Sequence, residues 1–252
     1  MNYLTYPCRV MRITQSYDGQ TSHLRHMTGA PKDYSLDEGC TDGGRDWIYC
    51  SCDGLKVVRI TGTRDSHHTN AIWLTSTSKV KLANGKESVA TLQFVHPNDD
   101  DLLKIKIGHI FKRGDKICRE GNDGATANHL HVAVGLGSIV GTGWTQNSKG
   151  AWVLTTTAGA IKPEDAFFID PDFTKIVKTC GLKFKELPSD KYVVTCDALN
   201  VRTGTTKDAH IVDVLTRGTV VKIEKVKTGW NGEQFGKIEK LGWACMKDMK
   251  RK

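Results

Sequence analysis

Short runs of alternating or β-branched residues dominate the pattern of apolar and polar positions along this chain. Five such runs are set off by turn-rich stretches, at residues 55–60, 71–75, 90–95, 129–134 and 152–156. Runs of this length and composition predict β-strands. Helical periodicity is weak, and the best helix candidate is residues 162–169, where a proline and two acidic residues follow Lys162. The pattern predicts a mainly β protein, either all-β or β-rich α+β.

Near residue 180 the spacing of predicted strands and turns changes, and this change predicts two domains. Residues 1–180 form the first, residues 181–189 are expected to be a linker, and residues 190–252 hold short strands separated by glycine-containing turns. About sixty residues of this kind predict a small barrel-like β module.

Several motifs of the second domain resemble a bacterial SH3-type cell-wall-binding domain. They are Ala198–Gly204, Leu215–Val221 and the two Gly-Trp pairs at 229–230 and 242–243. The resemblance implies that this module binds a cell wall, although the same positions also serve simply to form a small barrel.

Charge is distributed unevenly over the 252 residues, whose formal net charge is +8. Residues 1–189 hold 23 basic and 20 acidic side chains, whereas residues 190–252 hold 13 and 8. The excess favours an anionic partner, and the anionic polymers of a bacterial wall would attract the second domain. A nucleic-acid partner is not expected, because no basic helix or motif of stacking aromatic residues accompanies the charge.

The chain shows no sign of membrane insertion or export. No stretch approaches the roughly 18 consecutive apolar residues of a membrane span, and the first residues lack a basic region followed by an apolar run. We therefore expect a cytoplasmic protein on synthesis that acts on the cell wall after release. The eight cysteines are accordingly expected to be mostly reduced thiols. A structural metal or a later disulfide at Cys40, Cys50 and Cys52 is the alternative, although Cys50 and Cys52 lack the C-x₂-C spacing of zinc knuckles.

Histidines carry the main chemical signal, because eight of the nine lie within residues 1–131. His129 and His131 stand two apart in an alternating run, so a strand would direct both imidazoles to one face. The segment around Asp37 alternates similarly and is expected to present this carboxylate on the polar face of a strand. Two imidazoles and one carboxylate form a three-ligand set that leaves a position open for water, as catalytic zinc requires. His96 ends a further predicted strand.

The order His23, Asp37, His96, His129, His131 resembles that of the lysostaphin/LytM-type zinc metallopeptidases (metallopeptidase family twenty-three), which cut peptide bonds in peptidoglycan. Residues 107–117 are similar to the family's V-G-x-x-V-x-x-G-x-x-I hairpin, and residues 121–131 to its G-N-x-G-x-S-x-G-x-H-L-H run. The resemblance covers roughly residues 10–135. It implies an antiparallel β-sheet metallopeptidase domain that binds Zn²⁺.

Carried over position by position, the resemblance implies that His23, Asp37 and His131 are the zinc ligands. The spacing departs from the family's at one point, because thirteen residues separate the first histidine from the aspartate. His26 therefore competes with His23, and Asp33 competes with Asp37. We favour His23 for its Tyr17-x₄-Ser22 lead-in, and Asp37 because the segment Tyr34 to Asp37 matches the family's aromatic-x-aliphatic-Asp.

The expected catalytic residues are His129, His96 and Tyr17. Bound zinc would activate a water molecule and polarise the scissile carbonyl. No H-E-x-x-H motif supplies a glutamate base, so His129 is expected to transfer the proton, while His96 stabilises the oxyanion or shares that task. Tyr17 could donate a further hydrogen bond to the oxyanion, although a packed strand tyrosine is an equal interpretation.

The function that these expectations describe is peptidoglycan hydrolysis. The combination of a predicted peptidase domain and a predicted wall-binding domain resembles a phage endolysin of a Gram-positive host. Such an enzyme cuts the stem or cross-bridge peptides and so causes lysis. A bacterial autolysin of the same chemistry and a catalytically inactive wall-binding scaffold protein are the alternatives.

Overall fold

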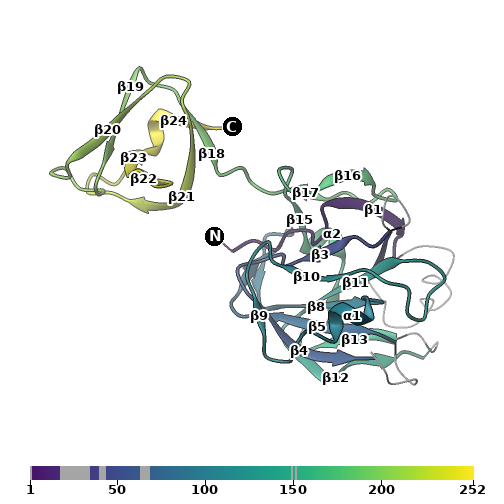
Figure 1. The fold of residues 1–252 in the computed structure, drawn as a ribbon. Helices are drawn as coiled ribbons and strands as arrows, with labels where there is room; N and C mark the ends of the chain where they lie inside the picture. Colours follow the sequence, from purple (N-terminus) through teal and green to yellow (C-terminus); the bar gives the residue numbers. More distant parts are fainter. Residues whose placement is uncertain (1, 18–34, 40–43, 63–68, 149, 151) are drawn as a thin grey trace. The chain divides into compact units, whose positions relative to one another are not determined.

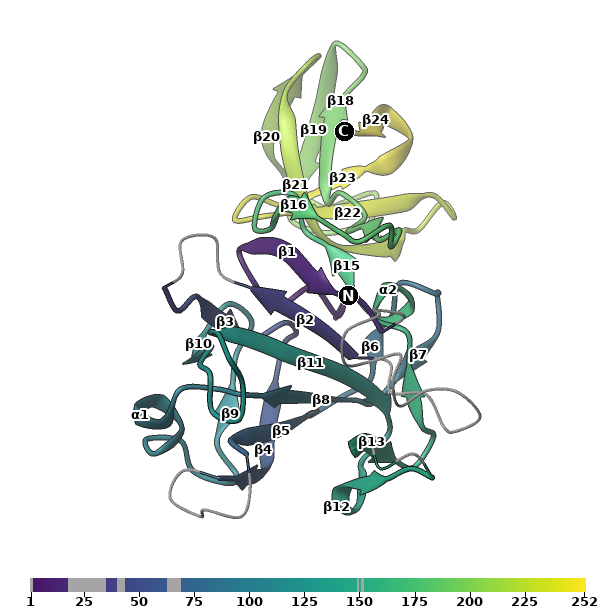
Figure 2. The ribbon, with the colours of Figure 1, turned by 90° about the vertical axis from the view of Figure 1, so that its right-hand side faces the viewer.

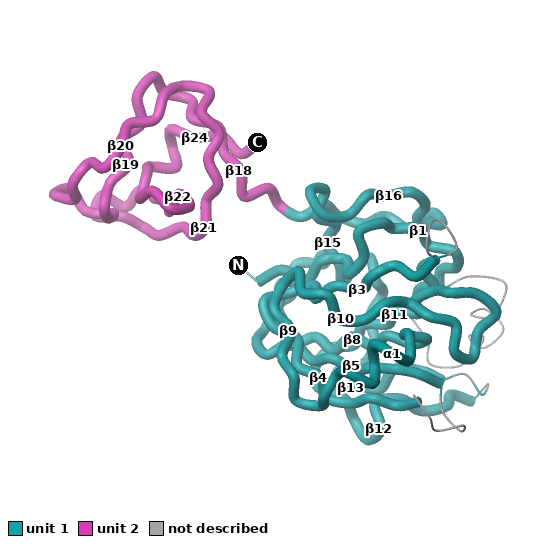
Figure 3. Tube along the Cα trace, viewed as in Figure 1, with its two compact units in different colours: residues 1–187 teal, residues 188–252 magenta. Residues whose placement is uncertain are grey.

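A computed structural model of the chain describes residues 2–17, 35–39, 44–62, 69–148, 150 and 152–252. The chain forms two compact units, Met1–Leu187 and Pro188–Lys252 (Figure 3). The predicted fold class is confirmed, because antiparallel β-sheets form both units and the described helices are single short turns.

The first unit is built around one large sheet (Figure 1). Its strands follow the order β16-β1-β2-β11-β8-β5-β4-β9, with β14 pairing on β11. In chain order they are β1 (Val10–Gln15), β2 (Ser35–Gly39), β4 (Leu55–Thr61), β5 (Ala71–Ser76), β8 (Ala90–Val95), β9 (Ile110–Phe111), β11 (His129–Leu136), β14 (Ala160–Ile161) and β16 (Lys175–Lys178). The pairs within this sheet are antiparallel apart from β1 with β16.

Smaller elements surround this sheet in the first unit. They are the pairs β3 (Trp47–Tyr49) with β10 (Lys116–Arg119), β6 (Val80–Lys81) with β7 (Glu87–Ser88), β12 (Ile139–Gln146) with β13 (Trp152–Thr156) and β15 (Phe168–Ile169) with β17 (Lys185–Glu186), and the one-turn helices α1 (Asp99–Leu102) and α2 (Pro163–Ala166).

The large sheet packs apolar side chains on both of its faces. Alternate residues of β11, such as Leu130 and Val132, enter the main hydrophobic core of the unit. Ala133 lies on the opposite face, in a smaller cluster with Trp73 and Leu154, and Leu154 belongs to β13. Because side chains alternate along a strand, His129 and His131 share the face of Ala133.

Three features of the first unit differ from the sequence-based expectations. The predicted helix over 162–169 contains only the turn α2, since residues 168–169 turn extended and pair with β17. The expected linker 181–189 supplies that strand, β17. The expected hairpin over 107–117 does not form a ladder, because β9 pairs with β4 while β10 pairs with β3. The apolar positions of that segment are instead shared between two sheets.

The second unit is one seven-stranded sheet of order β20-β19-β23-β22-β21-β18-β24. Its strands are β18 (Lys191–Val194), β19 (Ala198–Arg202), β20 (Ile211–Thr216), β21 (Val220–Thr228), β22 (Gln234–Ile238), β23 (Trp243–Cys245) and β24 (Met249–Arg251), with a 3-10 turn, η2, at Met246–Asp248. It has its own core of alternating apolar residues, including Val201 and Ile238. The SH3-type assignment remains a prediction.

Neither the helices nor the cysteines of the described residues suggest a membrane span or a disulfide framework. No helix among these residues is long and apolar enough to cross a membrane. The seven cysteines that the structure describes are free, and Cys50 and Cys52 are buried. Cys40, the third member of the expected cluster, lies outside the described residues.

Asp101 connects the helix α1 to β10. Its carboxylate is 7% exposed and accepts hydrogen bonds from the backbone N–H of Arg119 at 3.0 Å and from the guanidinium at 2.8 and 3.1 Å. The Arg119 hydrogen bonds lower the pKa of Asp101. An acid whose pKa is lowered by folding contributes stability above its unfolded pKa, and this contribution is lost as the pH falls through the folded value.

We therefore expect Asp101→Asn to lower the free energy of unfolding by about 1–2 kcal/mol at pH 7, toward the low end for a charged hydrogen bond because Arg119 is partly solvated. The difference from the wild type should shrink below about pH 4, where the unfolded carboxyl protonates. Urea denaturation at several pH values measures it, with the exposed neighbour Asp100→Asn as the control. A deficit that stayed constant down to pH 2 would contradict the expectation.

Candidate active site

Asp37 and His131 meet because β2 and β11 are neighbours in the large sheet (Figure 2). The antiparallel register places Asp37 directly opposite His131 and Gly39 opposite His129. Cross-strand partners share a face of a sheet, so the carboxylate and the imidazole project together. The strand expected around Asp37 is confirmed as β2.

The Asp37 carboxylate is the centre of the described cluster. Its Oδ1 lies 3.0 Å from Nδ1 of His131 and 3.8 Å from Nε2 of His129, and its Oδ2 accepts a hydrogen bond from the Gln15 amide at 2.8 Å. All three partners reach it from strands of the same sheet. Gln15 was not identified from the sequence; its place in β1, the strand beside β2, is the only signal for it.

His96 joins the cluster from the residue that follows β8. Its backbone has a φ of +67°, in the left-handed region that non-glycine residues seldom adopt. Its ring centroid lies 4.5 Å from that of His129 and 6.2 Å from that of His131. A strained backbone that turns a side chain toward a cluster of polar groups is typical of functional sites.

Burial lowers the pKa of His96 to about 4, against the opposing effect of a hydrogen bond to the Asp123 carbonyl. The two neighbouring histidines lower it further. His96 is therefore neutral at pH 7.

Two of the three histidines have their tautomer determined by a backbone carbonyl. Nδ1 of His96 lies 2.6 Å from the oxygen of Asp123, and Nδ1 of His129 lies 3.0 Å from that of Ala127. A carbonyl only accepts, so each Nδ1 carries a hydrogen, and in the neutral form of either ring Nε2 is the atom with the lone pair. Nε2 of His129 is left facing Asp37, at 3.8 Å from its Oδ1.

The described residues fit a zinc site in part. The 3.0 Å between Nδ1 of His131 and Oδ1 of Asp37 is close to the roughly 3.3 Å expected between two ligands of a tetrahedral zinc ion. His23 and its competitors His26 and Asp33 lie outside the described residues. Within the part of the chain that is described, no group of three or more His, Cys, Asp or Glu side chains is arranged to hold a metal.

Tyr17 lies in the main core and its hydroxyl has a partner from another element. The side chain is 4% exposed, and the hydroxyl donates a hydrogen bond to Glu164 of α2 at 2.6 Å. This environment matches the packed tyrosine that was the alternative interpretation. Hydrogen bonding to an oxyanion remains a prediction for Tyr17 and would require this bond to open.

A pocket of about 240 Å³ opens beside the cluster. The described residues that line it are two histidines, two tryptophans, two residues of β8 and one threonine that precedes β5: His96, His131, Trp144, Trp152, Gln93, Val95 and Thr69. The tryptophans belong to the paired strands β12 and β13. Gln93 was not identified from the sequence, because a single amide in an apolar strand carries no motif.

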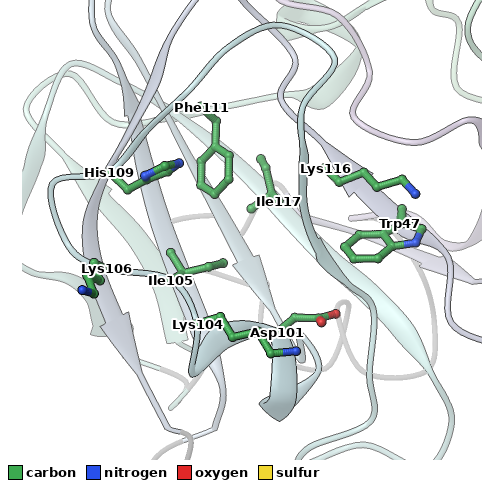
Figure 4. A pocket seen from close by; sticks show the side chains of 9 residues that line it. All are labelled: Trp47, Asp101, Lys104, Ile105, Lys106, His109, Phe111, Lys116 and Ile117. Carbon is green, nitrogen blue, oxygen red and sulfur yellow. The ribbon is translucent and has the colours of Figure 1, made fainter.

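His109 belongs to a different pocket, of about 370 Å³ (Figure 4). There it stands beside Phe111, with Trp47 on the opposite side of the view, and Lys104, Lys106 and Lys116 also line the pocket. The sequence assigned no role to His109, and the structure does not bring it to Asp37. His67 and His68, also left without a role, lie outside the described residues.

Fold and site together define a two-unit, mainly antiparallel β protein with a cluster of histidines around a carboxylate at one end of its large sheet. No family model matches the chain, and no curated protein matches it. Among solved structures, the chain is similar to the NMR solution structure of lysostaphin at 16% identity, with 85% of this chain and 80% of that chain covered and a TM-score of 0.34. It is also similar to the antimicrobial peptidase lysostaphin from Staphylococcus simulans at 16% identity, with 93% and 86% covered and a TM-score of 0.37.

Proposed function

We propose that the first unit is a zinc endopeptidase that hydrolyses stem or cross-bridge peptide bonds in the peptidoglycan of a Gram-positive cell wall. One observation carries the proposal: Asp37, His96, His129 and His131 come from three segments far apart in the sequence and meet beside one pocket. Asp37 and His131, with His23, are the residues that would hold the metal.

The chemistry divides between the ion and the histidines. Zinc, when bound, lowers the pKa of a water molecule and polarises a carbonyl. His129 would accept the proton of the attacking water at Nε2 and deliver it to the leaving nitrogen as the peptide C–N bond breaks. His96 presents a lone pair too, because its Nδ1–H is used by Asp123. It must therefore take up a proton before it can donate a hydrogen bond from Nε2 to an oxyanion.

Chelation is the direct test of this function. We expect the purified protein to clear a suspension of Gram-positive cell walls, to lose this activity after dialysis against a chelator and to regain it with zinc. New amino termini should appear in the released fragments, detected by mass spectrometry. Wall clearing that survives removal of all metal would contradict the zinc mechanism, and a metal-loaded protein that releases no amine would favour an inactive wall-binding scaffold protein.

We propose further that the second unit holds the enzyme on the wall, as in a phage endolysin that is made in the cytoplasm and acts after release. Support comes from its thirteen basic against eight acidic residues. If the attraction is electrostatic, the amount of protein that sediments with walls should fall several-fold between low salt and about 0.5 M salt, because the screening length shortens from roughly 10 Å at 0.1 M to 3 Å at 1 M. Sedimentation that does not change with salt would contradict this part of the proposal.

A further inference from the structure

The pocket of about 370 Å³ in the first unit, here called the lysine pocket, has an apolar floor that is continuous with the main core. Phe111 and Ile117 of this floor are 7% and 4% exposed and belong to the main hydrophobic cluster, and Ile105 packs against that cluster. In the view of Figure 4, Phe111 and Ile117 lie between His109 and Lys116. The lysine pocket shares none of its described lining residues with the pocket at the candidate active site.

The segment that supplies most of this lining also carries the positive charge of the first unit. Residues 103–117 hold five basic side chains and one acidic one, whereas the other residues of 1–189 hold 18 basic and 19 acidic. Arg113 of this segment is paired with Asp53 at 2.6 Å, so the remaining positive charge is that of four lysines. The charge distribution of the first unit therefore favours an anion at this segment.

Three of the four lysines line the pocket itself. Lys104, Lys106 and Lys116 are all exposed. Asp101, the acidic residue of the described lining, is 7% exposed, and its charge is offset by Arg119, whose Nε lies 2.8 Å from the carboxylate. The lysines are therefore the charges that a ligand in this pocket would meet.

Large aliphatic side chains stay exposed between these lysines. Leu103, Ile107 and Ile110 are 47%, 65% and 51% exposed. The alternation of aliphatic and basic residues from Leu103 to Ile107 is typical of a half-buried strand, but this run lies between α1 and β9 and belongs to neither. Of its three aliphatic residues, Ile105 packs on the core. Exposed aliphatic side chains that are grouped in this way are typical of a surface that meets an apolar partner.

The partner that fits must supply both an anion and apolar groups. A soluble phosphate or a phosphate-bearing wall polymer would pair with the lysines but leave the three exposed aliphatic side chains in water. A phospholipid supplies a phosphate for the ammonium groups and acyl carbons for the aliphatic side chains. Lysine stems lie along apolar surface while their charged ends stay among polar groups. Charge and apolar exposure together favour a membrane surface that contains anionic phospholipid.

We infer that the lysine pocket and the segment 103–117 bind the surface of an anionic phospholipid membrane. The lysines of the pocket hold a lipid phosphate, and the three exposed aliphatic side chains enter the boundary between headgroups and acyl chains. Binding of this kind takes place in the plane of the interface and needs no membrane span. The inference goes beyond the proposed function, because it concerns a different pocket and depends neither on zinc nor on peptide hydrolysis.

Flotation of the full chain with lipid vesicles tests the inference. We expect the protein to float with vesicles of phosphatidylglycerol and phosphatidylcholine in equal parts, and to stay behind with phosphatidylcholine alone. A lysine near an anionic membrane contributes about 1 kcal/mol, which is a factor of about five in affinity. The double variant Lys104→Gln/Lys106→Gln should therefore bind the anionic vesicles at least about tenfold more weakly.

The double variant Lys79→Gln/Lys86→Gln is the matched control for charge. It removes two exposed lysines of the same unit, beside β6 and β7, and leaves the second unit unchanged. Its affinity for the anionic vesicles should fall by less than about threefold, because a charge that does not face the membrane contributes less than one at its surface.

A further pair of variants tests the apolar contact. Ile107→Ser should bind the anionic vesicles at least about fivefold more weakly, because an aliphatic side chain no longer leaves water on binding. Ile176→Ser, at a position of β16 that is 50% exposed, should bind like the wild type. Neither variant empties a buried position, so both should melt at the temperature of the wild type.

Hydrogen–deuterium exchange locates the contact on the chain. Residues 103–117 should exchange more slowly on the anionic vesicles, and inorganic polyphosphate at the same phosphate concentration should protect them less.

Three results would overturn the inference. Equal losses of affinity in the two double-lysine variants would show that net charge alone is responsible. Protection by polyphosphate as strong as that by vesicles would identify a soluble anion or a wall polymer as the partner. Protection confined to the second unit would place the membrane contact there.

Discussion

Replacing Asp37 with asparagine is expected to reduce wall hydrolysis by more than about 100-fold and to remove bound zinc. The carboxylate is the group that His131, His129 and Gln15 all approach, and it is the negative charge that a metal bound there requires. Partners that only orient a metal ligand already contribute 10–100-fold in metal affinity, so loss of a ligand should exceed that. Zinc content by atomic absorption and the rate of wall clearing measure the two effects.

Asp100→Asn is the matched control, because Asp100 is an exposed carboxylate of the same unit, on α1. It should retain full zinc and activity. His96→Ala offers a second comparison: it should retain zinc yet lose activity, since His96 is expected to act on the substrate. Stoichiometric zinc and normal lysis in Asp37→Asn would show that the metal site lies elsewhere.

Replacing Trp73 with alanine is expected to lower the free energy of unfolding of the first unit by about 3–5 kcal/mol, the usual cost of emptying the space of a buried aromatic side chain. Trp73 is fully buried and belongs to the small cluster that joins the sheet to the hairpin β12–β13. Its removal takes away the support of Trp144 and the hydrogen bond to Gly143. The pocket beside the histidines should lose its wall, and wall clearing should fall along with stability.

Urea denaturation followed by far-UV circular dichroism measures the loss without relying on tryptophan fluorescence. Trp230→Ala, at an exposed position of the second unit, should change the free energy of unfolding by no more than about 0.5 kcal/mol. Trp73→Phe should fall between the two, because it retains a ring but not the indole N–H. A change below about 1 kcal/mol for Trp73→Ala would mean that the hairpin is held by other contacts.

Local pattern was sufficient for most of the strands. The runs at 71–75, 90–95 and 129–134 lie within β5, β8 and β11, because each alternates or is β-branched over the length of a strand. The predictions from sequence were wrong where the choice of the paired strand determines the local structure. Residues 168–169 continue a helical composition but pair with β17, and residues 107–117 divide between two sheets, a choice that no local pattern encodes.

The available chemistry follows from residue types and spacing alone: a histidine pair two residues apart, a carboxylate on a short predicted strand and a histidine that ends another predicted strand. Side-chain alternation was enough to predict that His129 and His131 share a face. The pairing of β2 with β11, which places Asp37 3.0 Å from His131, is a property of the folded chain.

Tertiary structure also decided the protonation and the lining of the site. The carbonyls of Asp123 and Ala127 orient two imidazoles, and burial keeps His96 neutral, effects that depend on neighbours distant in the chain or on the loop conformation. It likewise brought Gln93 and Trp152, about sixty residues apart in the sequence, into the lining of one pocket. Residue types and their period are local properties, whereas register, burial and hydrogen-bond partners arise when strands pair, and for that reason they had to be read from the fold.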